Sequence, residues 1–192
     1  HDGKSWYYLD SAGHPAGNGW SLIGSSWYYL SGGRVATGWL YNAGSWYYLN
    51  AATGAMATGW VQVDGQWYFL RSSGAMVTGW MNGGGPWYYL TGSGAMATGW
   101  LYDNGSWYYL DATNGAMATG WFQDGTTWYY SSSSGAMMTG WLNGGSSWYY
   151  LSGSGAMVTG WLHLGSSWYY MGGSGAMVTG TQVVDGHRST FE

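Results

Sequence analysis

The stretch Gly59–Leu70 reads Gly-Trp-Val-Gln-Val-Asp-Gly-Gln-Trp-Tyr-Phe-Leu, and most of the chain repeats its pattern. The pattern is Gly-Trp, six further residues, and then a second Trp followed by two aromatic residues. A fixed period near twenty residues indicates a repeat array, in which each unit packs against its neighbours. The eight copies place their two Trp at positions 20 and 27, 39 and 46, 60 and 67, 80 and 87, 100 and 107, 121 and 128, 141 and 148, and 161 and 168.

Each copy has the pattern of a β-hairpin. In Gly59–Leu70 two β-prone runs flank Asp64-Gly65, and Asp-Gly between two such runs favours a type I′ turn. Every copy has a Gly at one of these two positions, either second, as type I′ turns tolerate, or first, as type II′ turns require. We therefore expect two-residue turns at Gly24-Ser25, Ala43-Gly44, Asp64-Gly65, Gly84-Gly85, Asn104-Gly105, Gly125-Thr126, Gly145-Ser146 and Gly165-Ser166.

A two-residue turn fixes the register of the two strands. Gln62 then lies opposite Trp67, and Trp60 lies opposite Phe69. Directly opposed residues share a face and faces alternate along a strand, so Trp60, Trp67 and Phe69 lie on one face and Tyr68 on the other. Both faces are apolar, and an isolated hairpin is only marginally stable. The sequence therefore predicts an all-β solenoid of stacked hairpins, with about nine repeats of about 20 residues each.

We interpret residues 1–192 as one array. Residues 1–13 are a truncated first repeat, residues 14–180 are full repeats, and residues 181–192 are a divergent terminal cap that can still form a hairpin around Asp185-Gly186. Because the chain begins without Met, we expect it to be a fragment of a longer exported protein with an upstream domain.

The composition disfavours several classes of protein. Charged residues make up 6% of the chain and its net charge is −4, without a basic run, so a nucleic-acid partner is not expected. There is no cysteine, so there is neither a disulfide framework nor a thiolate site. No apolar run is long enough to span a membrane, so we expect no membrane insertion. The 17 Trp and 19 Tyr, in strict register, argue against a disordered chain.

The sequence also lacks the patterns typical of enzymes. The four histidines fall at unrelated positions of the repeat, and most aspartates lie at expected turns or strand ends, where turn chemistry explains them. No metal-ligand spacing and no strand-to-helix phosphate loop occurs. We therefore expect no catalytic residue, no metal and no cofactor.

The repeated Trp residues call for an explanation beyond core packing. Packing alone tolerates Phe, Leu or Tyr, yet both Trp positions remain Trp in all eight copies. Trp offers the best π surface for a cation, and cages of two or three aromatic rings hold quaternary ammonium groups. Such a group has no N–H to donate, so a nearly uncharged aromatic site suits it. A purely structural stalk remains an alternative.

The repeat resembles the choline-binding, or cell-wall-binding, repeat of Gram-positive surface proteins and cell-wall hydrolases. Residues 59–69 and the connector stretch Ser73-Gly74-Ala75-Met76-Val77-Thr78-Gly79-Trp80 carry the resemblance, which extends over about residues 5–180. It implies a left-handed superhelical solenoid in which each choline lies between consecutive hairpins. Two Trp of one hairpin and one aromatic ring of the next would hold it, often with a connector Met nearby.

The resemblance implies seven choline sites. The third ring of each is expected to be the second aromatic of the following Trp-Tyr-Tyr, because the register places that ring on the Trp face. Trp161 and Trp168 then lack a third ring, since Arg188 and Thr190 occupy the matching places. The expected sites are Trp20, Trp27 and Tyr48; Trp39, Trp46 and Phe69; Trp60, Trp67 and Tyr89; Trp80, Trp87 and Tyr109; Trp100, Trp107 and Tyr130; Trp121, Trp128 and Tyr150; and Trp141, Trp148 and Tyr170.

The resulting hypothesis is a non-catalytic module that anchors a larger protein, outside the cell and without a covalent bond, to the wall. Its partner would be choline or phosphocholine on teichoic and lipoteichoic acids, and an end-to-end dimer is compatible with such an array. Carbohydrate binding is the alternative, because glucan-binding repeats of glucosyltransferases and receptor-binding repeats of clostridial toxins resemble this unit too. Paired Trp on one face favours choline, whereas a sugar site would need more Asp, Asn, Gln or Lys at its rim.

Overall fold

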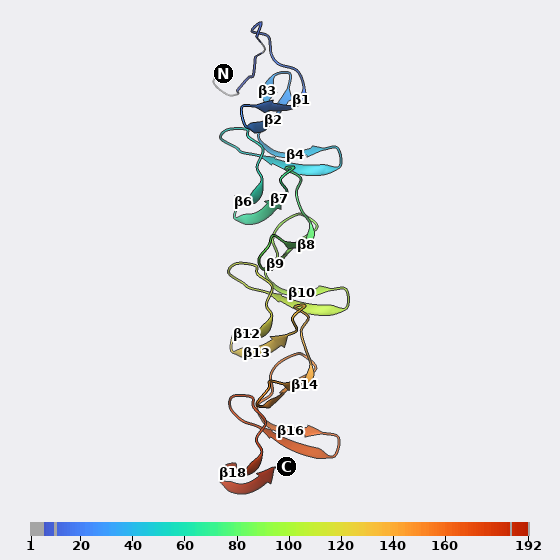
Figure 1. Ribbon diagram of the computed structural model, residues 1–192, viewed down its shortest axis with the longest axis vertical. Coiled ribbons are helices and arrows are strands. Elements are labelled where there is room, and N and C mark those ends of the chain that lie inside the picture. Colours follow the sequence, from blue (N-terminus) through green and yellow to red (C-terminus); the bar gives the residue numbers. More distant parts are fainter. Residues whose placement is uncertain (1–5, 10, 185, 192) are drawn as a thin grey trace. The chain divides into compact units, whose positions relative to one another are not determined.

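The computed structural model describes residues 6–9, 11–184 and 186–191, and the regular elements within these ranges are all β-strands (Figure 1). No helix long and apolar enough to cross a membrane is found in this part of the chain. The chain divides into two compact units, residues 1–97 and 98–192, which are described separately.

Both units consist of antiparallel hairpins joined by short connectors. In unit 2 the β16–β17 hairpin has the same orientation as β10–β11, three hairpins before it (Figure 1). The strands of unit 1 are β1 (Gly19–Ile23), β2 (Ser26–Ser31), β3 (Arg34–Val35), β4 (Gly38–Asn42), β5 (Ser45–Leu49), β6 (Gly59–Val63), β7 (Gln66–Leu70), β8 (Gly79–Asn82) and β9 (Trp87–Leu90). Those of unit 2 are β10 (Gly99–Asp103), β11 (Ser106–Leu110), β12 (Gly120–Asp124), β13 (Thr127–Ser131), β14 (Gly140–Asn143), β15 (Trp148–Leu151), β16 (Gly160–Leu164), β17 (Ser167–Met171), β18 (Gly180–Val184) and β19 (His187–Phe191).

The predicted register of the hairpins is confirmed. In β6–β7, Trp60 pairs with Phe69 and Gln62 with Trp67, and the other hairpins pair in the same way. Six of the eight expected turns have two residues. In three of them the first turn residue is not Gly yet has a φ of 47 to 49°, followed by a Gly with positive φ, as a type I′ turn demands; these residues are Ala43, Asp64 and Asn104.

Two hairpins differ from the expectation. In β8–β9 and β14–β15 the ladder ends one pair earlier, so residues 83–86 and 144–147 form four-residue loops in place of the expected two-residue turns. An Asn that ends the first strand explains the change, because its side chain competes for the backbone groups of the loop. Asn82 accepts from the N–H of Gly84 and donates to the carbonyl of Gly85, and Pro86 has no N–H to extend the ladder. Asn143 accepts from the N–H of Gly145.

Successive hairpins stack with opposite faces in contact. The Trp60 ring of β6–β7 lies 5.0 Å, centroid to centroid, from Tyr88 of β8–β9, which comes from the face that bears no Trp. In unit 2 Trp141 and Tyr169 repeat this contact at 4.9 Å. Within each unit the Trp face of a hairpin thus meets the Tyr face of the next Trp-Tyr-Tyr hairpin, and the stack is head to tail.

The connectors hold neighbouring hairpins together. The N–H of Met157 donates to the carbonyl of Trp128 in the preceding hairpin at 2.8 Å, while Val158 N–H donates to Tyr150 of the hairpin just completed at 2.9 Å. Connector Gly residues pack on the Met of the preceding connector, so closely that a Cβ at Gly175 would overlap with the sulfur of Met157. Within each unit these connectors thus contact two hairpins and set the distance between them.

In each unit the core is a column of side chains at the ends of the second strands. These side chains are at most 1% exposed, and several of their backbones form a bridge with the connector Met. Seven of them are apolar, but Ser131 occupies the same place in β13, and its buried hydroxyl has no hydrogen-bond partner among the described residues. The column comprises Leu30, Leu49, Leu70 and Leu90 in unit 1 and Leu110, Ser131, Leu151 and Met171 in unit 2.

The C-terminal segment forms the expected hairpin. Strands β18 and β19 pair with Val184 opposite His187 and Thr181 opposite Thr190. Of the expected turn residues, Gly186 has a φ of 79°, and Asp185 lies outside the described residues. This hairpin keeps the repeat's backbone without its aromatic residues.

Candidate functional site

Two walls of each candidate site come from one hairpin. Trp121 of β12 and Trp128 of β13 lie on the same face, diagonally across the ladder, with ring centroids 6.5 Å apart and planes at 82°. Five other Trp pairs have separations of 6.3 to 6.4 Å and angles of 84 to 88°. The register places the two indoles on one face, and their nearly perpendicular planes form two walls of a corner.

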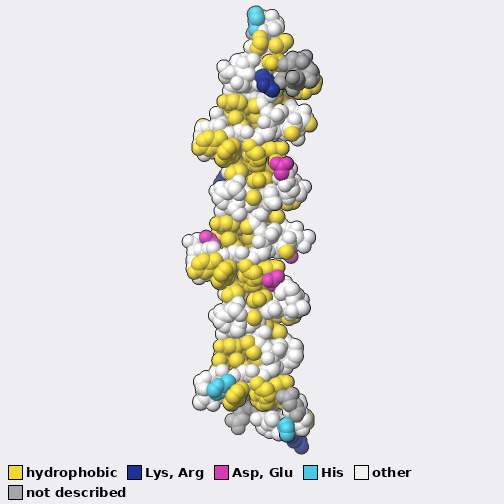
Figure 2. All heavy atoms as spheres, turned by 180° about the vertical axis from the view of Figure 1, so that it is seen from behind, with side chains coloured by type: hydrophobic (Ala, Val, Ile, Leu, Met, Phe, Trp, Pro, Cys, Tyr) yellow, Lys and Arg dark blue, Asp and Glu magenta, His cyan; other side chains and the backbone are white. Residues whose placement is uncertain are grey.

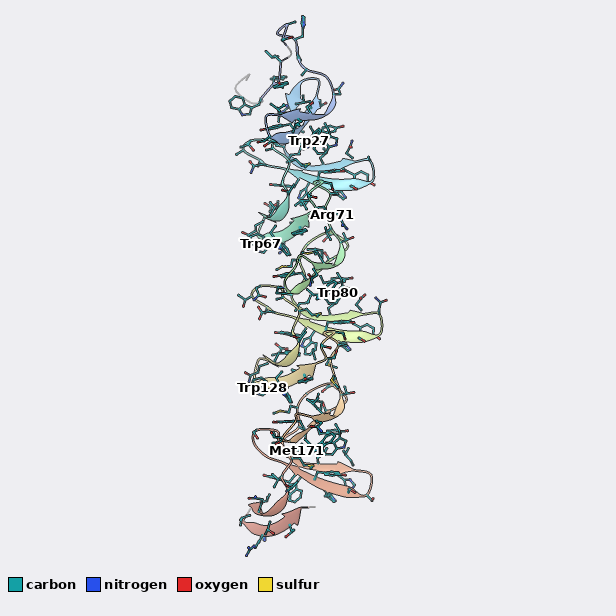
Figure 3. The ribbon with its side chains drawn as sticks, viewed as in Figure 1. Trp27, Trp67, Arg71, Trp80, Trp128 and Met171 are labelled. Carbon is teal, nitrogen blue, oxygen red and sulfur yellow. The ribbon has the colours of Figure 1, made fainter. Side chains whose placement is uncertain are left out.

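The third wall comes from the next hairpin. The ring centroid of Tyr149 in β15 lies 4.9 Å from that of Trp121, and the two ring planes make an angle of 66°. The connector Met157, whose N–H donates a hydrogen bond to the carbonyl of Trp128, lines a further side. Figure 3 shows Trp128 on the outer side of its hairpin, whereas Met171 of the buried column lies in the interior of unit 2. Equivalent contacts join Trp20 to Tyr47, Trp39 to Tyr68, Trp60 to Tyr88, Trp100 to Tyr129 and Trp141 to Tyr169, all at 4.8 to 5.0 Å.

Three of these cages enclose cavities of about 230, 310 and 440 Å³. Their rims include small residues of the turn that follows the hairpin two further along, a contribution that the sequence pattern did not predict. The linings are Trp39, Trp46, Tyr68, Met76 and Ser93; Trp121, Trp128, Tyr149, Met157, Gly173 and Ser174; and Trp100, Trp107, Tyr129, Met137, Gly153 and Ser154.

The third ring differs from the sequence expectation. The structure brings the first Tyr of the following Trp-Tyr-Tyr to the Trp pair, whereas the second aromatic contacts the first Trp of its own hairpin. Tyr150, for example, lies 5.2 Å from Trp141 and not in the cavity of Trp121 and Trp128. Head-to-tail stacking is the reason: a residue on the Trp face points to the following hairpin, so it cannot complete a cage with the preceding one. The other rings expected as third walls also lie 5.1 to 5.3 Å from the first Trp of their own hairpins: Tyr48, Phe69, Tyr89, Tyr109, Tyr130 and Tyr170.

One expected site spans both units. Trp80 and Trp87 belong to unit 1, where Trp80 lies 5.2 Å from Tyr89, and Tyr109 belongs to unit 2. Six cages therefore lie within a single unit, three in each.

The cage walls combine accessibility with low charge. The second Trp of these hairpins is 41 to 45% exposed, so part of its surface is accessible to a ligand. The lining residues Trp, Tyr, Met, Gly and Ser carry no charge at neutral pH. Hydrophobic side chains gather in recurring patches on the face shown in Figure 2, where few charged side chains appear. Such a site attracts a cation through ring faces and excludes groups that need a charged partner.

A carboxylate lies behind one cage. Asp124, at the end of β12, accepts hydrogen bonds from Nε1 of Trp100 at 2.8 Å and from the Tyr109 hydroxyl at 3.3 Å. Burial of Tyr109, together with the adjacent Asp124 carboxylate, raises the pKa of the Tyr109 phenol above its ordinary value. In unit 1 the amide of Asn42 occupies the equivalent position behind the Trp20 cage. Its oxygen accepts a hydrogen bond from Trp20 Nε1 at 3.3 Å.

The hairpin that follows the last Trp pair has no Tyr at the position that supplies the third wall of the other cages. Trp161 and Trp168 have the usual geometry, 6.3 Å and 84°, but the place of the first Tyr in β18–β19 is occupied by Ser189, which pairs with Gln182 as Tyr169 pairs with Leu162. His163 stacks on Trp168 at 4.4 Å.

Searches for related proteins place these cages in context. A family model of a choline-binding repeat matches residues 17–58, 57–97, 77–122 and 118–159, and a model of a cell wall binding repeat matches residues 1–14 and 159–177. No match was found among curated proteins.

Several solved structures are similar to this chain. CbpJ from Streptococcus pneumoniae TIGR4 is 41% identical with a TM-score of 0.87, and the match covers 97% of this chain and 74% of CbpJ. Choline binding protein F from S. pneumoniae, solved with a peptidoglycan analogue, is 46% identical with a TM-score of 0.77 over 86% of this chain and 59% of that protein. The choline-binding domain of CbpL from S. pneumoniae is 32% identical with a TM-score of 0.64, and 89% and 91% are covered.

Proposed function

Since this chain belongs to the choline-binding repeat family, we propose that its cages bind choline and that the module attaches a larger protein to the bacterial cell wall. The ligands are the choline or phosphocholine groups of teichoic and lipoteichoic acids. The module itself is non-catalytic, acts outside the cell and holds the wall without a covalent bond.

The three-ring cage is the observation that carries this proposal. Trp121, Trp128 and Tyr149 present ring faces around a cavity of about 310 Å³ without a charged lining residue. A trimethylammonium group has no N–H, so it loses no hydrogen bond on leaving water for such a cavity, and each ring face attracts its charge. A primary ammonium group would lose hydrogen bonds that this lining does not replace.

Multiple cages explain how weak sites can give firm attachment. A single cation–π contact contributes on the order of 0.5–2 kcal/mol, so one cage binds choline weakly. A polymer that carries choline at regular intervals can occupy several cages at once, and such linkage raises the overall affinity by roughly 10²–10⁴-fold. Free choline at high concentration would compete with the polymer and release the protein.

The test compares three additives in thermal unfolding. Choline binds where two hairpins meet and is lost when they separate, so it stabilises the folded chain by RT ln(1 + [L]/Kd) per site, about 2.7 kcal/mol at a hundredfold excess over Kd. We expect millimolar choline to raise the Tm, ethanolamine to have much less effect, and a glucan to have none. A rise with glucan but not with choline would refute choline binding and favour the carbohydrate alternative.

Wall attachment is tested separately. The chain is expected to bind to cell walls that carry choline, to be released by free choline, and not to bind walls from cells whose teichoic acids lack choline. Binding to both wall preparations alike would contradict the proposed anchor while leaving choline binding intact.

A further inference from the structure

Asp124 distinguishes the Trp100 cage from the other five cages that lie within a single unit. Its carboxylate accepts the indole N–H of Trp100, a wall of the cage that Trp107 and Tyr129 complete. In those five cages the residue at the position equivalent to Asp124 is Asn, Val, Gly or Leu. None of these side chains carries a charge. These residues are Asn42, Val63 and Gly83 in unit 1 and Gly144 and Leu164 in unit 2.

The environment of this carboxylate preserves its electrostatic effect. Tyr109, its second donor, is only 8% exposed and stacks on Phe122 at 4.8 Å, and Phe122 lies 5.7 Å from Trp100. These apolar rings limit the access of water, and charges interact more strongly where water is scarce. Residues 98–192 contain a single Lys or Arg, Arg188, three hairpins further along. A cation in the cage would therefore be the principal positive charge close to Asp124.

The hydrogen bond also acts on the ring itself. A cation is drawn to the negative face of an indole, and a carboxylate at the indole N–H adds negative potential on the same side of the cavity wall. Asn42 accepts a hydrogen bond from the N–H of Trp20 at the equivalent position, at 3.3 Å, but contributes no charge. The Trp100 and Trp20 cages thus differ in the charge behind this wall, and also in the neighbouring residue, which is Phe122 at the first and Leu40 at the second.

We propose that Asp124 determines affinity, and that the cage of Trp100, Trp107 and Tyr129 binds quaternary ammonium ligands more tightly than the other five cages within the two units. This inference rests on the proposed choline binding and adds an order of occupancy to it. The Trp100 cage fills first, and the uncharged cages fill at higher choline concentration.

The experiment follows individual cages in the whole chain. The protein is labelled with 5-fluorotryptophan, and the ¹⁹F signals of Trp107 and Trp27 are assigned through Trp107→Phe and Trp27→Phe and titrated with choline. Asp124→Asn keeps an acceptor for Trp100, and we expect it to weaken choline binding at Trp107 by about threefold to tenfold. The reciprocal change Asn42→Asp should strengthen binding at Trp27 by a similar factor, and salt should reduce both effects.

Two controls separate charge from packing. The neutral tert-butyl isostere of choline, 3,3-dimethylbutan-1-ol, should bind equally to wild type and to Asp124→Asn. Asp64→Asn removes one charge at an exposed turn and should leave both signals' titrations unchanged.

The outcomes are distinct. Absence of choline shifts at both wild-type cages would refute the proposed function. If choline binds with the same affinity at Trp107 in wild type and in Asp124→Asn, this inference alone is overturned. It is also overturned if Asp124→Asn weakens the binding of choline and of its neutral isostere by the same factor. Should Asp124→Asn fail to fold, the absence of tighter binding in Asn42→Asp overturns the inference.

Discussion

The Trp121–Trp128 pair and the Trp161–Trp168 pair have the same internal geometry and different surroundings. Ring separations of 6.5 and 6.3 Å and angles of 82 and 84° make the two corners equivalent. The first corner faces Tyr149 and is closed, and its Trp128 is 41% exposed. In the hairpin that follows the second corner, Ser189 takes the position of that Tyr, and Trp168 is 62% exposed.

This comparison shows that one hairpin supplies two walls of a site and that the next hairpin must supply the third. A hairpin makes two walls by itself, because its register puts both indoles on one face. The third wall depends on what the next hairpin presents on its opposite face, so a binding site exists only where two complete repeats are stacked. The C-terminal hairpin keeps the backbone pairing of the repeat but has Ser189 in place of the first Tyr.

The largest effect is expected from breaking the stack beneath the closed cage. Leu151 ends the strand that carries Tyr149 and is fully buried, so Leu151→Ala should lower the free energy of unfolding by about 2–5 kcal/mol. Leu22→Ala is the matched control, since Leu22 is 58% exposed and its loss should cost less than about 0.5 kcal/mol. Urea unfolding followed by Trp fluorescence measures both. Equal destabilisation by the two changes would contradict the buried column.

The second prediction converts the closed cage into a copy of the open one. Tyr149→Ser reproduces the situation at Ser189 and should remove one choline site, because one of three ring faces is lost. Tyr149→Phe retains the ring and should keep the site. Titration calorimetry gives the number of cholines bound. Loss of the Trp121 cage in Tyr150→Ser, with Tyr149→Ser unaffected, would restore the grouping expected from the sequence.

The third and smallest prediction completes the open corner. Ser189→Tyr should place a ring opposite Trp161 and add one weak choline site, with a gain on the order of 0.5–2 kcal/mol from the new ring face. Thr190→Tyr is the control, because Thr190 pairs with Thr181 on the other face of the hairpin and should add no site there. The readout is the ¹⁹F signal of Trp168 during choline titration. A shift with Thr190→Tyr alone would show that the faces had been assigned wrongly.

The sequence by itself determined the repeat, the hairpins and the face of each residue. The spacing of Trp60 and Trp67 around Asp64-Gly65 fixes the register through local backbone hydrogen bonds, and alternation of side chains then assigns the faces. Turn length was predicted wrongly in two hairpins, because the side chains of Asn82 and Asn143 form hydrogen bonds with the loop backbone and the ladder ends one pair earlier. This competition is local, and Asn followed by Gly-Gly is the signal that could have revealed it.

Only the tertiary structure decided which ring completes a cage. The pattern makes both Tyr149 and Tyr150 available, and they lie on opposite faces of the same strand. The choice depends on which face turns toward the preceding hairpin, and this is set by the connector, whose Met157 N–H bonds to Trp128 across the repeat boundary. Two other features of the cages also depend on the tertiary structure. They are the rim residues two hairpins further along, such as Gly173 and Ser174 at the Trp121 cage, and the hydrogen bond from Trp100 to Asp124. These contacts join residues about 20 to 55 positions apart, and their formation depends on the rise and rotation between hairpins, which no residue spacing within one repeat encodes.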